Sequence, residues 1–166
     1  MIRALTPQDL EDILTVINDG ARAYGGVIPG DCWHEPYMPR EELLLELDAG
    51  VRFWGLEKER KLAGVMGRQD LPEVTLIRHA YVRTEYQRQG IGSRLLARVL
   101  QGLKPPVLVG TWAAAWWAIR FYERHGFRLV TPAEKERLLR TYWTISHRQI
   151  ETSVVLEWEP AKYSSQ

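Results

Sequence analysis

The chain has 166 residues, of which 45% are apolar and 26% charged, and its formal net charge is +1. This size and composition are typical of one globular domain with a single core, and the small net charge gives no electrostatic reason to expect nucleic acid or a membrane as a partner. Cys32 is the single cysteine, so no internal disulfide forms, and no run of about 18 apolar residues is present. We expect a cytoplasmic protein without a signal peptide or membrane span.

The first half of the chain predicts a strand, two helices and three further strands. Thr6-Pro7-Gln8-Asp9 combines a capping residue, a proline at the first helical position and an acid at the third, which is typical of a helix start. Apolar residues at helical spacing follow it. The expected elements are a strand at 2–5, helices at about 6–20 and 40–49, and strands at 51–57, 61–69 and 74–82. The strands at 51–57 and 61–69 are close enough to form a hairpin.

The second half predicts alternating helices and strands. Pro105-Pro106 ends the first of these helices, and Gly126 ends the second. Thr131-Pro132 repeats the capping pattern seen at Thr6. The expected elements are helices at 92–103, 113–125 and about 133–142, and strands at 106–112, 127–130 and 150–158. The whole order predicts an α/β (α+β) fold with a mixed sheet and an antiparallel meander near its start.

A glycine motif, TEYQRQGIGSRLL at 84–96, lies between a predicted strand and a predicted helix. The first N–H groups of a helix lack acceptors and favour an anion, and Gly90 and Gly92 leave room for a phosphate. Arg88 adds a positive charge. A tight turn without ligand is the alternative. No Gly-Lys-Ser/Thr follows, which excludes a nucleotide-hydrolase loop, and Leu95 stands where a dinucleotide fingerprint needs a small residue.

A second motif, AIRFYERHGF at 118–127, follows the first by one helix and one strand. Gln87–Gly92 and residues 118–127 together resemble the two common motifs of the GCN5-related N-acetyltransferase (GNAT) superfamily. The resemblance covers residues 2 to about 130 and the last strand. It implies one acyl-CoA N-acyltransferase domain over 1–166, with a mostly antiparallel sheet, a splayed parallel strand pair and an extra helical insertion at about 131–148.

The resemblance also implies acetyl-CoA as the acyl donor, held between residues 75–82 and 106–111. The diphosphate would bind the N–H groups of residues 87–92, the pantetheine would pair with the strand ending at Val82, and an N–H near Val82 would polarise the thioester carbonyl. The implied cofactor-binding residues are Ala80, Tyr81, Val82, Gln87, Arg88, Gln89, Gly90, Ile91, Gly92 and Ser93.

The implied reaction is direct attack of a primary amine on the thioester in a ternary complex. Tyr122 matches the family's usual general acid, and an ordinary tyrosine pKa near 10 keeps it protonated at neutral pH. The alternative role for Tyr122 is packing of its helix on the sheet. Where some members place a glutamate base, this chain has Leu76, so His79 is the nearest titratable candidate. A relay through water, or an amine that arrives neutral, needs no base.

The acceptor would bind the segment between the first two helices, which in this family lines the acceptor pocket. Its aromatic and polar residues suit a small polar amine, and we expect Tyr24, Trp33, His34 and Tyr37 to contact it. Cys32 and His34 have no matching second pair, so no metal site is expected. The helical insertion could cover the acceptor site, form a homodimer contact or be a surface excursion. A non-catalytic acyl-CoA-sensing module and a protein N-acetyltransferase are the alternative functions.

Overall fold

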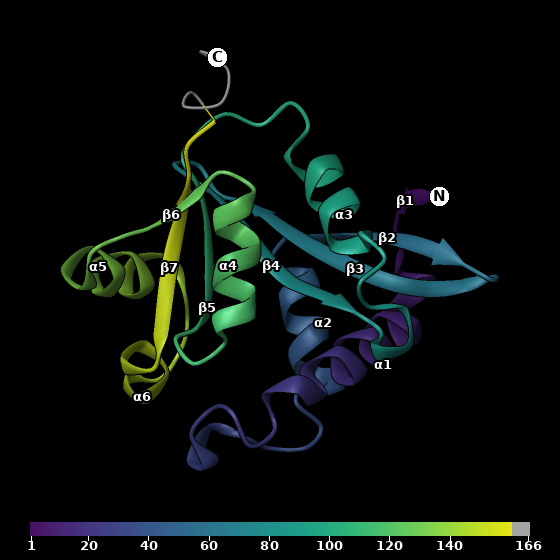
Figure 1. Cartoon of the computed structure of the whole chain (residues 1–166), viewed down its shortest axis with the longest axis horizontal. Coiled ribbons are helices and arrows are strands. Elements are labelled where there is room, and N and C mark those ends of the chain that lie inside the picture. The colour runs from purple at the N-terminus through teal and green to yellow at the C-terminus, as the bar shows by residue number, and fades with distance from the viewer. Residues whose placement is uncertain (161–166) are drawn as a thin grey trace.

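The structure is a computed structural model that describes residues 1–160. Its centre is a seven-stranded sheet in the order β1-β2-β3-β4-β5-β7-β6 (Figure 1). Neighbouring strands are antiparallel except β4 and β5, which are parallel. The expected mixed, mostly antiparallel sheet with one parallel pair is therefore confirmed. The strands are β1 (Ile2–Ala4), β2 (Val51–Lys58), β3 (Lys61–Asp70), β4 (Thr75–Val82), β5 (Val107–Trp112), β6 (Phe127–Leu129) and β7 (Ser153–Trp158).

Helices cover both faces of the sheet. The α-helices are α1 (Leu10–Gly20), α2 (Arg40–Asp48), α3 (Ile91–Leu100), α4 (Trp116–Arg124), α5 (Pro132–Tyr142) and α6 (His147–Glu151). Successive residues of a strand point to opposite faces. Ile77 accordingly packs with residues of α3 and α4, whereas Leu76 packs with residues of α5 and α6. Helices α1 and α2 share a third buried cluster with β2 and β3, and Figure 1 shows α5 and α6 beside β7, at the end of the sheet away from β1.

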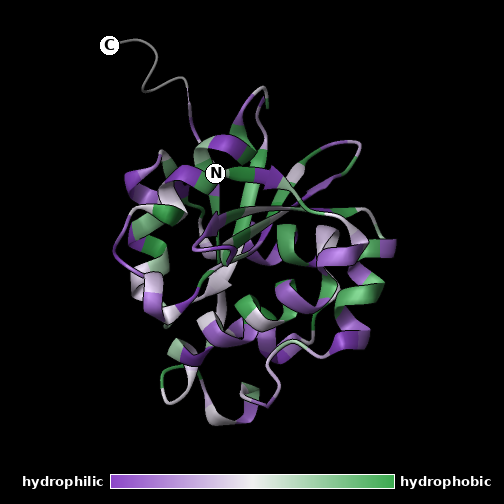
Figure 2. Cartoon of the chain, turned by 90° about the vertical axis from the view of Figure 1, so that its right-hand side faces the viewer, coloured by the Kyte–Doolittle hydropathy of each residue, from purple (hydrophilic) through white to green (hydrophobic). Residues whose placement is uncertain are grey.

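The amphipathic patterns that predicted the helices are visible in the folded chain. Figure 2 shows helices banded with hydrophilic and hydrophobic residues, as expected for helices with one buried face. Within residues 1–160, no helix has the length and apolar composition required to cross a membrane.

The capping pattern at the start of the chain forms as predicted. The Thr6 hydroxyl accepts a hydrogen bond from the Gln8 N–H, and the Asp9 carboxylate accepts one from the Thr6 N–H at 2.8 Å. The guanidinium of Arg3 also donates two hydrogen bonds to Asp9, at 2.9 and 3.0 Å. The first turn, Pro7–Asp9, is a 3₁₀ turn, and the α-helix proper begins at Leu10.

Three predicted boundaries are wrong. The helix expected at 92–103 ends at Leu100, because the chain leaves the helical conformation at Gln101 and turns at Gly102, whose φ is 78°. The helix expected at 113–125 begins only at Trp116, because Ala113 donates its N–H to the Thr152 carbonyl at 2.8 Å and so continues the line of β5. The strand expected at 150–158 begins at Ser153, because Ile150 and Glu151 belong to α6. Helix α6 was not predicted, although Ser146 caps it by accepting a hydrogen bond from the Gln149 N–H at 3.1 Å.

Strands β4 and β5 separate after a short parallel pairing. Their paired residues are Thr75 with Val107, Leu76 with Leu108 and Ile77 with Val109, and the pairing stops there. Just beyond, β4 has a bulge: His79 and Ala80 together face the single residue Met66 of β3, and His79 has a φ of 53°. A bulge bends its strand and adds twist, so this one turns the end of β4 away from β5.

Candidate active site

A cleft of about 420 Å³ opens where β4 and β5 separate. Its walls come from the end of α1, the end of β4, the turn before α3 and one side of α4. All residues predicted to hold the cofactor line this cleft except Gln89. The Gln89 side chain instead accepts a hydrogen bond from Lys58 at the surface.

The turn before α3 presents free backbone donors to the cleft. Arg88 and Gly90 both have positive φ angles, 64° and 76°, and α3 starts immediately afterwards at Ile91. The N–H groups of residues 90–93 have no acceptor within residues 1–160, and no side chain caps the helix. Residues 87–93, which we call the cradle, therefore combine open donors, the positive end of a helix dipole and the Arg88 guanidinium, all of which favour an anion.

The two glycines of the cradle serve different purposes. A Cβ added at Gly90 would have no atom within 4 Å, and Gly90 lines the cleft. A Cβ added at Gly92 would lie 3.3 Å from the ring of Phe121 on α4. Gly90 thus gives the left-handed turn and open space, as the sequence suggested, whereas Gly92 chiefly lets α3 approach α4.

The edge of β4 that faces the cleft has no neighbouring strand. Beyond Ile77, β4 pairs only with β3, so the backbone groups of residues 80–82 that point away from β3 are open to the cleft. An open strand edge is a template for an extended ligand, which can add to it as another strand would. The C-terminal end of α1 packs closely here, because a Cβ at Gly20 would lie 3.1 Å from the Val82 carbonyl oxygen.

Tyr122 lies on α4 with its ring in the core. The ring contacts Phe121 and Phe127 with centroid distances of 5.1 and 5.4 Å, and 5% of the residue is exposed. Its hydroxyl makes no hydrogen bond within residues 1–160 and is not among their fully buried unpaired polar atoms, so it reaches the accessible surface. Burial, with a smaller contribution from Tyr24, raises the Tyr122 pKa well above its usual value, so this phenol is protonated at neutral pH.

The packing role considered for Tyr122 is thus present, and this packing leaves its hydroxyl without a hydrogen-bond partner within residues 1–160. Tyr122 itself is not among the residues that line the cleft, although its neighbour Phe121 is.

His79 lies away from the cleft lining. Its imidazole hydrogen-bonds to Glu46 on α2 and stacks on Phe53, with a centroid distance of 6.1 Å. Burial favours a raised Glu46 pKa, but the hydrogen bond and charge of His79 outweigh it, so the Glu46 pKa is lowered. Glu73 also has a partner, since it accepts a hydrogen bond from the Tyr142 hydroxyl at 3.0 Å. The bulge therefore directs His79 toward α2 rather than toward the cleft.

The predicted acceptor residues gather around one ring. Tyr37 contacts Tyr24, Trp33 and His34 with centroid distances of 5.4, 6.0 and 6.2 Å. The Tyr37 hydroxyl accepts a hydrogen bond from Trp112 Nε1 at 2.7 Å. Of the four predicted residues, Tyr24 lines the cleft, whereas Trp33, His34 and Tyr37 are not among the lining residues. No group of three or more potential metal ligands occurs within residues 1–160.

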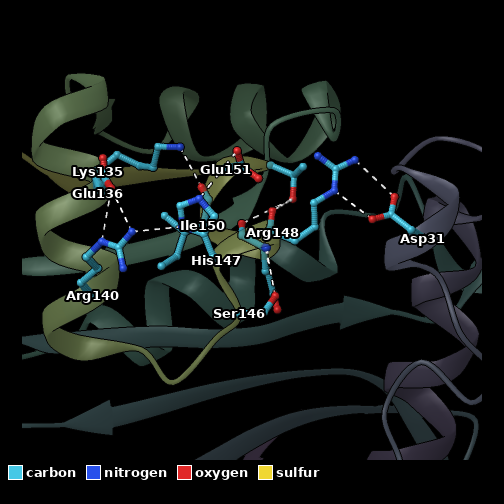
Figure 3. Close-up of polar contacts among 11 residues, drawn as sticks. Asp31, Lys135, Glu136, Arg140, Ser146, His147, Arg148, Ile150 and Glu151 are labelled. Carbon is cyan, nitrogen blue, oxygen red and sulfur yellow. Dashed lines mark hydrogen bonds and ion pairs between the residues drawn. The ribbon is translucent and has the colours of Figure 1, made fainter.

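The segment at about 131–148, expected as a helical insertion, contacts the loop between α1 and α2, which we call the acceptor loop. Arg148 on α6 donates two hydrogen bonds to the carboxylate of Asp31, at 2.9 and 3.2 Å (Figure 3). Lys135 on α5 donates to the Ile150 carbonyl at 2.8 Å, which ties α5 to α6. The insertion is anchored on the sheet, because Leu139 packs with residues of β5 and β7. No local pattern in the sequence indicates the contact between Arg148 and Asp31.

Comparisons with known proteins agree with this geometry. Residues 49–129 match the family model described as Acetyltransferase (GNAT) domain. A search of curated proteins found no match.

Three solved structures show the same fold. PaiA N-acetyltransferase from Thermoplasma acidophilum, in complex with coenzyme A, has a TM-score of 0.71 and 18% identity over 96% of this chain and 98% of its own. Ribosomal-protein-S18-alanine N-acetyltransferase from Escherichia coli has a TM-score of 0.64 and 18% identity, over 95% and 92%. A GNAT family acetyltransferase from Elizabethkingia anophelis, with acetyl-CoA bound, has a TM-score of 0.61 and 20% identity, over 96% and 97%.

The sheet order and the separated strand pair give this chain the fold of the GNAT acetyltransferases, whose family model it matches over residues 49–129.

Proposed function

We propose that this protein is an acetyl-CoA-dependent N-acetyltransferase that transfers the acetyl group to the primary amine of a small molecule. The observation that carries the proposal is the cleft itself, in which the free N–H groups at the start of α3 face the open edge of β4. A phosphate-bearing, extended ligand has the chemistry to satisfy both. Related folds have been solved with coenzyme A or acetyl-CoA bound.

The donor binds along the cleft in three parts. Its diphosphate accepts hydrogen bonds from the N–H groups of the cradle, with Arg88 as a charged partner. Its pantetheine arm adds to the open edge of β4 at Ala80–Val82. The thioester then lies near the end of β4, where a backbone N–H near Val82 stabilises the developing oxyanion.

The amine attacks the thioester carbonyl directly. Its nitrogen forms a bond to the carbonyl carbon, and the carbon–sulfur bond breaks. Tyr122 gives its phenolic proton to the departing thiolate and regains one from solvent. The raised pKa keeps the phenol protonated until the thiolate forms, and the hydroxyl has no hydrogen-bond partner within residues 1–160 that would hold its proton. The amine loses its surplus proton to water in the open cleft, because no aspartate, glutamate or histidine is among the residues that line it.

Two experiments test the proposal. Acetyl-CoA at 100 times its Kd adds about 2.7 kcal/mol of stability. It should therefore raise Tm by roughly 5–10 °C, whereas NAD should not. Release of free CoA, measured across a panel of amines, should depend on Tyr122, and Tyr122→Phe should lower kcat by about 100-fold with the KM for acetyl-CoA unchanged.

The outcomes separate the alternatives. Tight acetyl-CoA binding without transfer to any amine or peptide would indicate an acyl-CoA-sensing module. Transfer to peptide N-termini but to no free amine would indicate a protein N-acetyltransferase. Unchanged turnover of Tyr122→Phe would remove Tyr122 from the mechanism.

A further inference from the structure

An aromatic cluster forms one wall of the cleft. It consists of Tyr24, Trp33, Tyr37, Tyr81 and Trp117, and three parts of the chain supply these rings: the segment between α1 and α2, β4 and α4. Tyr24 lies at the centre, with centroid distances of 5.4 Å to Tyr37, 6.2 Å to Tyr81 and 6.1 Å to Trp117. Tyr24, Tyr81 and Trp117 line the cleft, so the rings form a wall that a ligand can touch.

This wall is close to the proposed reaction point. Tyr24 stacks on Trp117, which belongs to α4, the helix that also carries Tyr122. Tyr81 belongs to the part of β4 at which the thioester is proposed to lie. An amine that reaches the thioester from this side would have its body against the rings of Tyr24, Tyr81 and Trp117.

The wall carries no charge. Burial raises the pKa of Tyr24 and the pKa of Tyr81, so both phenols are neutral at physiological pH. No carboxylate lines the cleft, and the two cations that do, Arg88 and Arg124, lie on the cradle and at the end of α4.

Three nearby carboxylates already have partners. Asp31 is paired with Arg148, Glu46 with His79 and Arg78, and Asp19 with Thr84 and Arg22. Glu35 and Glu42, the other carboxylates close to Tyr37, do not line the cleft, so a second ammonium group on the acceptor would find no carboxylate on the wall itself.

We propose that the acceptor is a monoamine whose body is a planar aromatic ring, of the arylalkylamine type, rather than a polyamine or an amino acid. The inference rests on the proposed acetyl transfer and specifies its acceptor. Aromatic rings stack well on such a wall, and the burial of an aromatic body favours binding by roughly 10- to 100-fold over a small aliphatic amine. This replaces the small polar amine that the sequence suggested, because Asp31 of the acceptor loop is bound to Arg148 and the other acid of that loop, Glu35, does not line the cleft.

The test compares kcat/KM for phenethylamine, cyclohexylethylamine, ethylamine, spermidine and lysine with acetyl-CoA as donor. We expect phenethylamine to exceed ethylamine, spermidine and lysine by about 10-fold or more, and to exceed the non-planar cyclohexyl compound. A preference for spermidine or lysine would overturn the aromatic acceptor and leave acetyl transfer intact. Absence of transfer to every amine, with acetyl-CoA still bound, would overturn both.

Two adjacent tryptophans provide a matched pair of variants. Trp117 lines the cleft and stacks on Tyr24, whereas Trp116 is 60% exposed and contacts Arg120 and the edge of the Trp117 ring. Trp117→Leu should lower kcat/KM for phenethylamine about 10-fold more than for ethylamine, and Trp116→Leu should not change the ratio between the two amines. An equal effect of Trp117→Leu on both amines, or no effect, would contradict the proposal. If Trp117→Leu fails to fold, the comparison of amines on the unmodified protein decides.

Discussion

Gly90 and Gly102 form a natural pair for testing the cradle. Both have left-handed backbone, with φ of 76° and 78°, and a Cβ added at either would have no atom within 4 Å. Gly90 lines the cleft, whereas Gly102 follows the end of α3 and does not. Alanine at either position therefore meets the same backbone strain, and only the methyl group at Gly90 points into the space proposed for the diphosphate.

The expected magnitudes separate strain from binding. Left-handed backbone costs a non-glycine residue about 1 kcal/mol, so both Gly90→Ala and Gly102→Ala should lower the Tm of the free protein by roughly 2–4 °C. If the methyl group weakens acetyl-CoA binding by about 100-fold, a concentration that gave about 2.7 kcal/mol of stabilisation gives about 0.4 kcal/mol. The ligand-induced rise in Tm should then fall from roughly 5–10 °C to about 1 °C in Gly90→Ala alone.

Differential scanning fluorimetry measures both quantities, and calorimetric titration gives the Kd directly. Gly102→Ala should bind acetyl-CoA as the unmodified protein does. Equal affinity of Gly90→Ala and Gly102→Ala for acetyl-CoA would show that the diphosphate does not lie against the turn before α3, and the proposed donor site would be wrong.

Three further predictions concern stability and the acceptor side. The hydrogen bond from Arg3 lowers the pKa of Asp9 from 3.8 to about 2. The ionised Asp9 carboxylate therefore stabilises the folded protein above pH 4, and this contribution disappears between about pH 4 and 2. After allowance for solvent screening we expect about 1 kcal/mol, which urea denaturation at pH 6 and pH 3 should show and Asp9→Asn should abolish. Reversing the charge of Asp31 or Arg148 alone should raise the KM for the amine by about 2- to 5-fold and leave the KM for acetyl-CoA unchanged. Reversing both charges together should restore the KM for the amine. Failure of that rescue would show that the ion pair between Asp31 and Arg148 does not affect acceptor binding. A Cβ at Gly67 would lie 2.9 Å from a backbone oxygen of β4, so Gly67→Ala should lose about 1–3 kcal/mol in thermal unfolding, while Gly30→Ala, which meets no atom within 4 Å, should lose almost none.

Local patterns in the chain were sufficient for most of the secondary structure and for the cradle. The capping box at Thr6 and the amphipathic run after Gly92 depend on neighbours a few residues away, so the sequence encodes them directly. The cradle is equally local, since a strand, a glycine turn and a helix start follow one another without interruption. The exception is α6, whose five residues are too few to show a clear period, although its cap at Ser146 could have indicated it.

The direction in which each side chain of the site points is determined by contacts between residues far apart in the sequence. The bulge in β4 directs His79 to Glu46, which no local pattern around residue 79 could have indicated. Packing of α4 on the sheet buries the ring of Tyr122, and the meeting of Asp31 with Arg148 joins residues 117 positions apart. Helical and strand periods specify which face of an element is apolar, but the partner on that face is chosen by how the elements pack. The family and donor-site motifs could therefore be recognised from the sequence, whereas the neutral aromatic wall forms only when three distant segments, the acceptor loop, β4 and α4, pack together.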